Sequence, residues 1–473
     1  MFFNSFQFLW LFPVLFAGTW LIGGGQRCYR RLQNIFLLIA SYGLYMQYKP
    51  IYALILLGIT AVTYWGALLI SKCEAYGKRK YLIVVFAVLG LLPLGIFKYY
   101  NFLNDSLTAG LQAIGIQVGL PGLNWIVPLG ISFFSFQAVG YLWDVYYKKI
   151  TVEYDWWDYM LFVSFFPQIA SGPISKAKDL LPQIKADRQF DYTKVVEGCK
   201  WLLWGMFLKV VLADRTGMLV DTILPNYTYL SGATCAFGAV LYSFQIYGDF
   251  AGYSLMAVGV GRLLGFDLIH NFKRPYFAAT ITEFWKRWHI SLTKWLTDYV
   301  YIPLGGSRCS KRRNFLNIFL TFLVSGIWHG ANWTFVIWGI IHGGIQIVEK
   351  GLKIQKCENR GVRPIRVLFT FVFVTIAWIV FRMPTISDAY GVMEKIVIEW
   401  GKLSYTASVV DKLFVFGSLF TLLVVEWFEE YYPSVSLLNN KNVVVRWCTY
   451  VTLIFVVLLC GVFDAGSFIY VNF

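Results

Sequence analysis

Long apolar segments, separated by short polar loops, recur along the whole chain. A helix needs about 20 apolar residues to cross a bilayer, and several of these segments are shorter. A short segment can lie in a membrane only where protein or a cavity satisfies its backbone polar groups. The pattern therefore predicts about eleven transmembrane helices and one or two re-entrant pieces. The apolar segments are 6–24, 34–48, 50–70, 81–100, 127–147, 156–172, 198–216, 233–264, 314–329, 331–349, 365–384, 412–428 and 446–466.

One stretch has a different pattern. Residues 282–301, TEFWKRWHISLTKWLTDYVY, place apolar side chains at helical spacing on one face and charged side chains on the other. This pattern predicts one amphipathic helix that lies at or just inside the cytoplasmic interface and ends at IPLGG, residues 302–306. The apolar positions are Phe284, Trp285, Trp288, Leu292, Trp295, Leu296 and Tyr299.

Composition supports a membrane protein. The chain is 58% hydrophobic and 14% charged, whereas soluble domains have about 25% charged residues. No low-complexity segment or flexible linker interrupts the 473 residues. We therefore expect an all-α polytopic membrane protein with a single integral domain, 1–473.

The net charge of +15 predicts topology. Basic residues gather in the loops at 27–31, 72–80, 173–197 and 308–313, and cytoplasmic loops collect Lys and Arg. This places the N-terminus outside, with the first apolar segment retained as a membrane helix and the 217–232 and 385–411 loops also outside. The scattered cations form no basic domain that would bind nucleic acid.

His329 is the first candidate for chemistry, in SGIWHGANWT, residues 325–334, of a chain with four histidines. An ionisable residue in a membrane segment is a functional candidate by default. Desolvation favours the neutral imidazole, which can act as a general base. The alternative is a core histidine that is hydrogen-bonded across helices, and the residues alone leave both interpretations open.

The other histidines are weaker candidates. His289 lies in the amphipathic stretch, and taken alone it is expected to be a packed structural residue. The presence of His329 strengthens it as a catalytic candidate, because acyl or proton transfer uses two such groups. If one helix ran from 329 to 342, steps of about 100° would place His342 on a different face from His329, which favours a structural role. His270 lies in a polar loop, and we assign it no function.

Acidic residues and cysteines add little. Asp249 begins a long apolar run, GDFAGYSLMAVG, where an ion pair with a loop cation is favoured over a place in the wall of a site. The eight cysteines form no C-x-x-C pair, so no disulfide framework is expected. No cluster of residues with metal-ligand spacing is present in the sequence, and no metal site is expected.

Five motifs follow one another along the chain: VPLGISFFSFQAVGYLWDVY, FVSFFPQIASGPI, YGDFAGYSLMAVGVGRLLGF, NFKRPYFAATITEFWKRWHISLTKWLTDYVYIPLGG and SGIWHGANWTFVIWGIIHG. In this order they resemble the membrane-bound O-acyltransferase (MBOAT) family. Its bacterial branch, which contains the alginate O-acetylation protein AlgI, the peptidoglycan acetylation protein PatA and the D-alanyl transfer protein DltB, is the most similar. The C-terminal SFIYVNF also resembles that branch.

The resemblance implies a ring of helices around a thin centre, where funnels from both faces meet. It also implies that His329, in the W-H-G motif, and His289, in the R-W-H-x-S motif, are the catalytic pair. Trp328, Asn332 and Trp288 are then expected to contact substrate, and Asp249 and His342 are further candidates for substrate contact. Leu255 stands where the family has an aspartate, so a role for that carboxylate is not carried over.

The function that the resemblance implies is acyl transfer across the bacterial cytoplasmic membrane. The expected donor is a cytoplasmic thioester, acetyl-CoA in the AlgI and PatA proteins, and no cofactor is expected to stay bound. An exported SGNH-type transferase would pass the acetyl group to a polysaccharide or to peptidoglycan. Two alternatives stay open: D-alanyl transfer to teichoic acid with a carrier protein, as in DltB, and a transporter or scaffold without chemistry.

Overall fold

The computed structural model describes residues 3–22, 27–117, 119, 121–357, 359, 361–405, 408–432, 434, 436–463 and 469. Every regular element in these ranges is a helix, and none is a strand. The prediction of an all-α protein is confirmed. Apart from Ile469, the C-terminal SFIYVNF lies outside the described residues.

The chain divides into two compact units. Unit 1 comprises Met1–Gly198 and Val260–Ile269, and unit 2 comprises Cys199–Gly259 and His270–Phe473. All the histidines and the other candidate residues of the site belong to unit 2. The prediction of a single domain stays a prediction.

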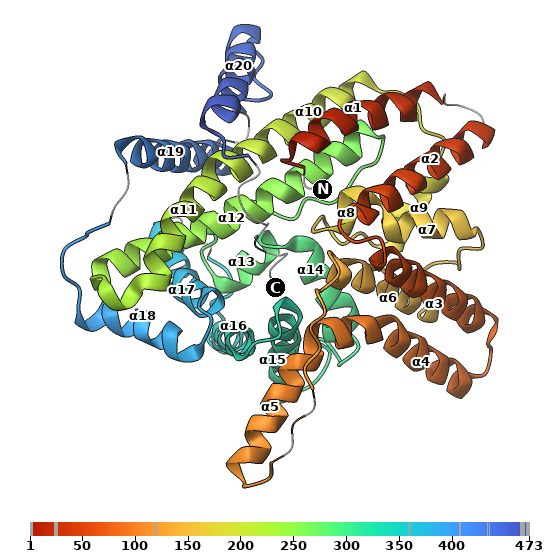
Figure 1. Cartoon of the computed structure of the whole chain (residues 1–473), viewed down its shortest axis with the longest axis horizontal. Coiled ribbons are helices and arrows are strands. Elements are labelled where there is room, and N and C mark those ends of the chain that lie inside the picture. Colours follow the sequence, from red (N-terminus) through yellow and green to blue (C-terminus); the bar gives the residue numbers. More distant parts are fainter. Residues whose placement is uncertain are drawn as a thin grey trace. The chain divides into compact units, whose positions relative to one another are not determined.

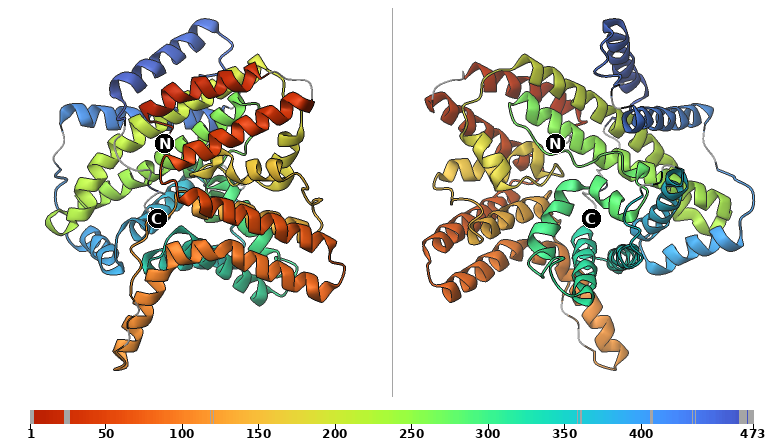
Figure 2. Two further views of the ribbon diagram at one scale, coloured as in Figure 1. Left: turned by 45° about the vertical axis from the view of Figure 1, so that its right-hand side comes forward. Right: turned by 180° about the vertical axis from the view of Figure 1, so that it is seen from behind.

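Unit 1 contains the N-terminal helices. Within it α3, α4 and α6 lie side by side, as Figures 1 and 2 show. The Asp155 carboxylate caps α7 by accepting from the backbone N–H of Trp157 at 2.9 Å. The elements are α1 (Phe6–Leu21), α2 (Arg27–Met46), α3 (Tyr52–Lys72), α4 (Tyr76–Leu94), the π-helical η1 (Gly95–Tyr99), α5 (Tyr100–Ala113), α6 (Ile131–Tyr146), α7 (Trp156–Ser164), α8 (Phe166–Ile169) and α9 (Ala177–Lys185).

Unit 2 contains the candidate site. Two helices, α10 (Tyr192–Met206) and α12 (Gly232–Leu263), include residues of both units. The remaining elements are η2 (Phe207–Ala213), α11 (Asp214–Ile223), η3 (Leu224–Tyr229), η4 (Pro275–Phe277), α13 (Ile281–Arg287), α14 (Ile290–Leu296), η5 (Thr297–Tyr301), α15 (Lys311–His329), α16 (Trp333–Gly351), α17 (Arg363–Arg382), α18 (Ile386–Ile398), α19 (Val409–Tyr431) and α20 (Val443–Cys460).

Four stretches of helix among the described residues are long and apolar enough to cross a membrane: Tyr52–Lys72, Tyr76–Ala113, Arg363–Arg382 and Val443–Cys460. The shorter apolar helix α1 covers most of the first predicted segment. Length and composition thus agree with a membrane protein, and the expected total of eleven spans stays a prediction.

Several segments differ from their expected form. Residues 156–172 form no single span, because the chain breaks between α7 and α8, where Pro167 follows the first residue of α8. The loops expected at 217–232 and 385–411 are largely helical, since α11, η3 and α18 lie in them. The sequence pattern did not predict these helices, because they are short, mixed in polarity and buried on one face only.

A tight helical hairpin joins α15 and α16, which lie side by side in Figure 1. The two helices cross at Gly326 and Gly339, where a Cβ built on Gly339 would lie 2.6 Å from the carbonyl oxygen of Phe322. A Cβ on Gly326 would collide with the carbonyl oxygen of Phe335. Only glycine permits this approach of the two backbones.

We expect Gly326→Ala to destabilise the protein by about 1–3 kcal/mol, because the new methyl group overlaps backbone atoms that cannot move independently. Thermal unfolding of the detergent-solubilised protein measures the effect. Gly344→Ala is the matched control on α16, since nothing lies within 4 Å of its Cβ position. An unchanged melting temperature for Gly326→Ala would show that the crossing is not closely packed.

Candidate active site

His329 is the last residue of α15, directly before the turn of the hairpin. It is buried, with 2% of its surface exposed. Aromatic rings surround the imidazole: the ring centroids of Trp328, Trp338 and Phe381 lie 5.0, 5.0 and 5.3 Å from its own.

Asn332 shapes the turn after His329. Its side-chain oxygen accepts from the backbone N–H of Thr334 at 3.0 Å and so caps α16. Its amide nitrogen donates to the carbonyl oxygen of Pro384 at 2.8 Å. These bonds give Asn332 a structural role in fixing the end of α15, and with it the position of His329.

His289 lies in a break between α13 and α14, so the single amphipathic helix expected over 282–301 is wrong. The backbone of His289 is left-handed, with φ 44° and ψ 54°. A non-glycine residue adopts this conformation at a cost of about 1–3 kcal/mol, and only where the surroundings impose it. The apolar stripe of this stretch is buried in the protein.

Backbone hydrogen bonds from a neighbouring segment impose the break. The N–H of Trp288 closes α13 by donating to the carbonyl oxygen of Phe284 at 2.8 Å. The N–H of Ile290 then donates to the carbonyl oxygen of Asn271, and the N–H of Lys273 donates to that of Arg287, both at 2.9 Å. The segment around Asn271 therefore holds both sides of His289.

The structure brings the two candidate catalytic histidines to the same indole. The ring of His289 packs against Phe250, with centroids 4.6 Å apart, and against Trp328, with centroids 5.8 Å apart. Trp328 also contacts His329. The sequence separation of 40 residues could not show this meeting.

Trp288 and His342 are both fully buried. The Trp288 ring packs at 5.1 Å from Trp378. His342 accepts a hydrogen bond at Nδ1 from Trp285 Nε1, at 3.2 Å. The turn after His329 places His342 on the returning helix, so the argument from one continuous helix fails, and both histidines contact Trp338.

Asp249 lies in a buried ion pair. Its Oδ1 is 2.6 Å from Lys209 Nζ, which also lies 2.7 Å from Asp214 Oδ1. Its Oδ2 accepts from the backbone N–H of Ile469 at 2.8 Å. The expected ion pair of Asp249 is confirmed, although its partner belongs to the π-helical η2 and not to a loop. A lysine inside the apolar segment 198–216 was the signal that sequence reasoning passed over.

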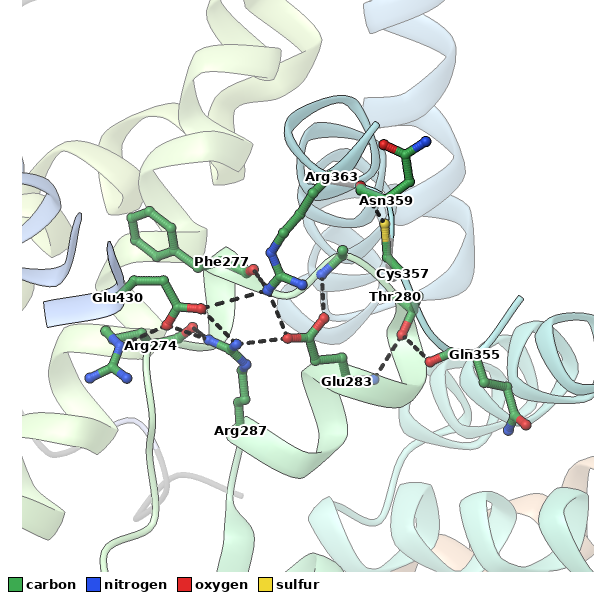
Figure 3. A network of polar contacts seen from close by, with 11 residues as sticks. Arg274, Phe277, Thr280, Glu283, Arg287, Gln355, Cys357, Asn359, Arg363 and Glu430 are labelled. Carbon is green, nitrogen blue, oxygen red and sulfur yellow. Dashed lines mark hydrogen bonds and ion pairs between the residues drawn. The ribbon is translucent and has the colours of Figure 1, made fainter. Parts of the chain in front are cut away.

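A network of charged side chains supports the break at His289 (Figure 3). Arg287 donates to both carboxylate oxygens of Glu430, at 2.8 and 2.9 Å, and to Glu283 at 2.7 Å. Arg274 also donates to Glu430, and Arg363 also donates to Glu283. Nothing in the sequence pairs Glu430 with Arg287, because the two residues are 143 positions apart.

A cavity of about 580 Å³ opens beside the hairpin. Lys286 and Ser307 lie at its exposed part, and Trp285, Leu292 and Ser325 at its buried part. Further lining residues are Thr282, Thr293, Leu296, Thr297, Tyr301, Ile318, Thr321, Phe322, Gln346, Lys350 and Gln355. The cavity thus leads from charged surface to the Trp285 indole that bonds to His342.

Comparison with known proteins identifies the family. Residues 145–383 match the MBOAT, membrane-bound O-acyltransferase family. The probable alginate O-acetylase AlgI of Pseudomonas aeruginosa is 37% identical over 396 residues, which are 83% of this chain and 74% of that protein. This chain belongs to the membrane-bound O-acyltransferase family. As a member it is a multi-pass membrane O-acyltransferase that uses an acyl donor, and the expected family, fold class and enzyme class are confirmed.

Two further relatives come from other bacteria. The peptidoglycan O-acetyltransferase of Helicobacter pylori is 32% identical over 84% of this MBOAT protein and 79% of its own length. The teichoic acid D-alanyltransferase of Bacillus subtilis is 28% identical, over 80% of this chain and 97% of its own length. The expected AlgI- and DltB-like branch is therefore confirmed.

The network around Arg287 predicts a pH dependence of stability. Burial opposes ionisation of Glu430, but hydrogen bonds from Arg287 and Arg274 outweigh it and lower the pKa of this carboxyl from 4.5 to about 2. The ionised carboxylate therefore stabilises the fold above about pH 5, and this contribution is lost as the pH falls towards 2. We expect Glu430→Gln to lower the melting temperature at pH 7 and to flatten its decrease below pH 5.

Thermal unfolding of both proteins between pH 2 and pH 8 tests this expectation. Glu429→Gln is the control, because among the described residues that carboxylate has an ion pair with Arg274 alone, at 3.3 Å, and its side chain is 42% exposed. Parallel pH curves for wild type and Glu430→Gln would contradict the role given to Glu430.

Proposed function

We propose that this enzyme moves an acetyl group from cytoplasmic acetyl-CoA across the bacterial cytoplasmic membrane, for O-acetylation of an exported polysaccharide or of peptidoglycan. The similarity to an alginate O-acetylase and to a peptidoglycan O-acetyltransferase supports the acetyl group and the glycan acceptor. The N-terminus lies outside in this proposal, so that the basic loops face the cytoplasm.

The observation that carries the proposal is the meeting of His289 and His329 on the indole of Trp328. In the proposed reaction His329 accepts the proton of an acceptor hydroxyl while the hydroxyl oxygen forms a bond to the thioester carbonyl carbon. The carbon–sulfur bond breaks, and the thiolate takes the proton from the imidazolium. His289 orients the acceptor or stabilises the developing charge, and Trp328 and Trp288 form the wall behind the two rings.

The acceptor hydroxyl belongs to the glycan, or to an exported SGNH-type transferase that passes the acetyl group on. Asn332 and Asp249 have no direct part in this proposal, because both are engaged in holding the fold. His342 acts indirectly through Trp285, whose indole lines the cavity.

The cavity is the proposed path of the donor. Lys286 and Lys350 can approach the phosphates of coenzyme A at its exposed part, and apolar side chains line its buried part. Arg308, and Lys311 to Arg313 at the start of α15, belong to the basic stretch 308–313 that is predicted to be cytoplasmic. A donor would thus enter from the side on which acetyl-CoA is made.

D-alanyl transfer is the second candidate, favoured by the match over 97% of the Bacillus subtilis D-alanyltransferase. It would use the same histidines and would also need an acyl carrier protein to dock on the cytoplasmic side. The acid released from the modified glycan separates the two candidates. A transporter or scaffold without chemistry would leave acylation intact when both histidines are replaced.

We expect His329→Ala to abolish the base-labile ester on surface glycans, and His289→Ala to reduce it strongly, because loss of a general base lowers a rate by about 10²–10⁴. Cells that lack the gene are complemented with each variant at matched membrane levels, and mass spectrometry identifies the released acid. His270→Ala is the control histidine, since its ring packs against Trp201, with centroids 4.9 Å apart, and we assign it no part in the reaction. Full ester with His329→Ala would refute the catalytic assignment.

Replacing Lys286 and Lys350 by Ala should raise the KM for acetyl-CoA several-fold, because each exposed charge pair contributes up to about 1 kcal/mol. The KM for an acetyl thioester of pantetheine, which lacks the nucleotide, should change little. Lys294→Ala is the control, because this exposed lysine of α14 does not line the cavity. Equal effects on both donors would show that the lysines do not contact the nucleotide.

A further inference from the structure

One face of α15 forms a wall of the cavity. Ile318, Thr321, Phe322 and Ser325 recur at intervals of three and four residues, and all four line it. His329 follows Ser325 by four residues, so it lies on the same face one turn further along. With a rise of about 1.5 Å per residue, the backbone advances about 6 Å between them. Ser325 therefore marks the part of the cavity wall that lies nearest to His329 along this helix.

The hydroxyl of Ser325 is in an unusual state. The residue is 1% exposed, and its Oγ has no hydrogen-bond partner among the residues that the structure describes. A serine or threonine inside a helix commonly donates to the carbonyl oxygen four residues earlier. Thr321, one turn before, does so, donating to Asn317 at 2.6 Å. Ser325 has the same opportunity and does not use it.

A buried hydroxyl without a partner is costly unless something else supplies the hydrogen bond. Ser325 lines a cavity of about 580 Å³, and sites for small molecules have about 300–1,000 Å³. Phe322 and Trp285 of the same wall are aromatic, and the Trp285 N–H is already donated to His342. The Ser325 hydroxyl is thus a buried polar group without a partner among the described residues, in a residue of the cavity wall, and a ligand carbonyl would satisfy it.

We propose that the Ser325 hydroxyl donates a hydrogen bond to the thioester carbonyl oxygen of the acyl donor, which makes Ser325 a catalytic residue in addition to the two histidines. This inference rests on the proposed function and adds one residue to its site. The donor class is an acyl thioester on a phosphopantetheine arm, with its charged end towards Lys286 and Lys350 and its acyl end at Ser325.

The chemistry of the transfer explains why a hydrogen-bond donor is needed beside the carbonyl oxygen. When the acceptor oxygen bonds to the carbonyl carbon, the carbonyl electrons move to its oxygen, which gains negative charge. The Ser325 O–H stabilises this charge until the carbon–sulfur bond breaks and the electrons return. The proton of the acceptor passes through His329 to the leaving thiolate, so Ser325 itself neither gains nor loses a proton. In a dry site one such donor changes a rate by about 10²–10³.

Ser325→Ala in the full-length protein tests the proposal. The assay follows transfer from radiolabelled acetyl-CoA to endogenous glycan in membranes of the expressing cells. We expect kcat to fall about ten- to a hundredfold, with the KM for acetyl-CoA changed less than threefold and the melting temperature unchanged or raised. Stability should not suffer, because the substitution removes a hydroxyl that has no partner in the described chain.

Two variants make the result specific. Ser325→Thr keeps the hydroxyl and should retain most of the activity. Ser418→Ala removes a buried hydroxyl of α19 that is bonded to its own helix and does not line the cavity, so its kcat should stay within twofold of wild type. Isotope-edited infrared spectra of bound acetyl-CoA should show a lower carbonyl stretching frequency in wild type than in Ser325→Ala.

The outcomes separate this inference from the proposed function. If wild-type membranes transfer acetyl and Ser325→Ala matches them in kcat, the role of Ser325 is refuted while the proposed function stands. If Ser325→Ala loses activity together with thermal stability, and Ser325→Thr fails to restore it, Ser325 is structural and the proposal is refuted. If wild-type membranes transfer no acetyl from acetyl-CoA, the proposed donor is wrong, and the carbonyl assignment to acetyl-CoA falls with it.

Discussion

The crossing of α15 and α16 at Gly326 and Gly339 is the constraint on which the site depends. The backbones approach so closely there that no side chain fits between them. This approach determines where the hairpin turns, and the turn places His329 at the end of one helix and Trp338 and His342 on the next. Because dispersion forces and close packing drive helix association in a membrane, two glycines stabilise this helix crossing more than larger apolar side chains would.

The second histidine depends on a different kind of interaction. His289 adopts a left-handed backbone that an unsupported helix would not tolerate. Hydrogen bonds from the segment at 271–273 and the charged network centred on Arg287 stabilise this conformation. The network is buried to a considerable degree, and each charge has a partner, which is the condition under which ion pairs persist away from water. The protein thus uses packing for one histidine and electrostatics for the other.

Both arrangements serve one chemical need. A base and an acyl carbonyl react best where water is excluded and the polar groups are already in place. Aromatic rings pack around the buried His329. Ser325 fits the same logic, because its hydroxyl has no partner in the described part of the chain and the residue lies in the cavity wall one turn before His329. The unsatisfied hydroxyl lowers the stability of the free protein, and a hydrogen bond to a bound acyl donor would offset that loss.

The sequence by itself determined the class of the protein and indicated its main candidate site residues. The recurrence of apolar segments indicates helices in a membrane. The bilayer core offers the backbone no hydrogen-bond partners, and a helix satisfies its backbone groups internally. The W-H-G and R-W-H motifs named His329 and His289, and the start and end of α12, α15 and α16 agreed with the apolar segments to within a few residues. Each of these features is local, so a pattern along the chain can reveal it.

Only the tertiary structure decided how those residues meet. The break at His289, the shared contact with Trp328 and the pairing of Arg287 with Glu430 join segments that are 40 or more residues apart. The hydroxyl of Ser325 became informative only when its lack of a partner and its place in the cavity wall were both visible. A residue type in a sequence states what bonds it can form. Which of those bonds are made depends on neighbours that the folded chain alone supplies.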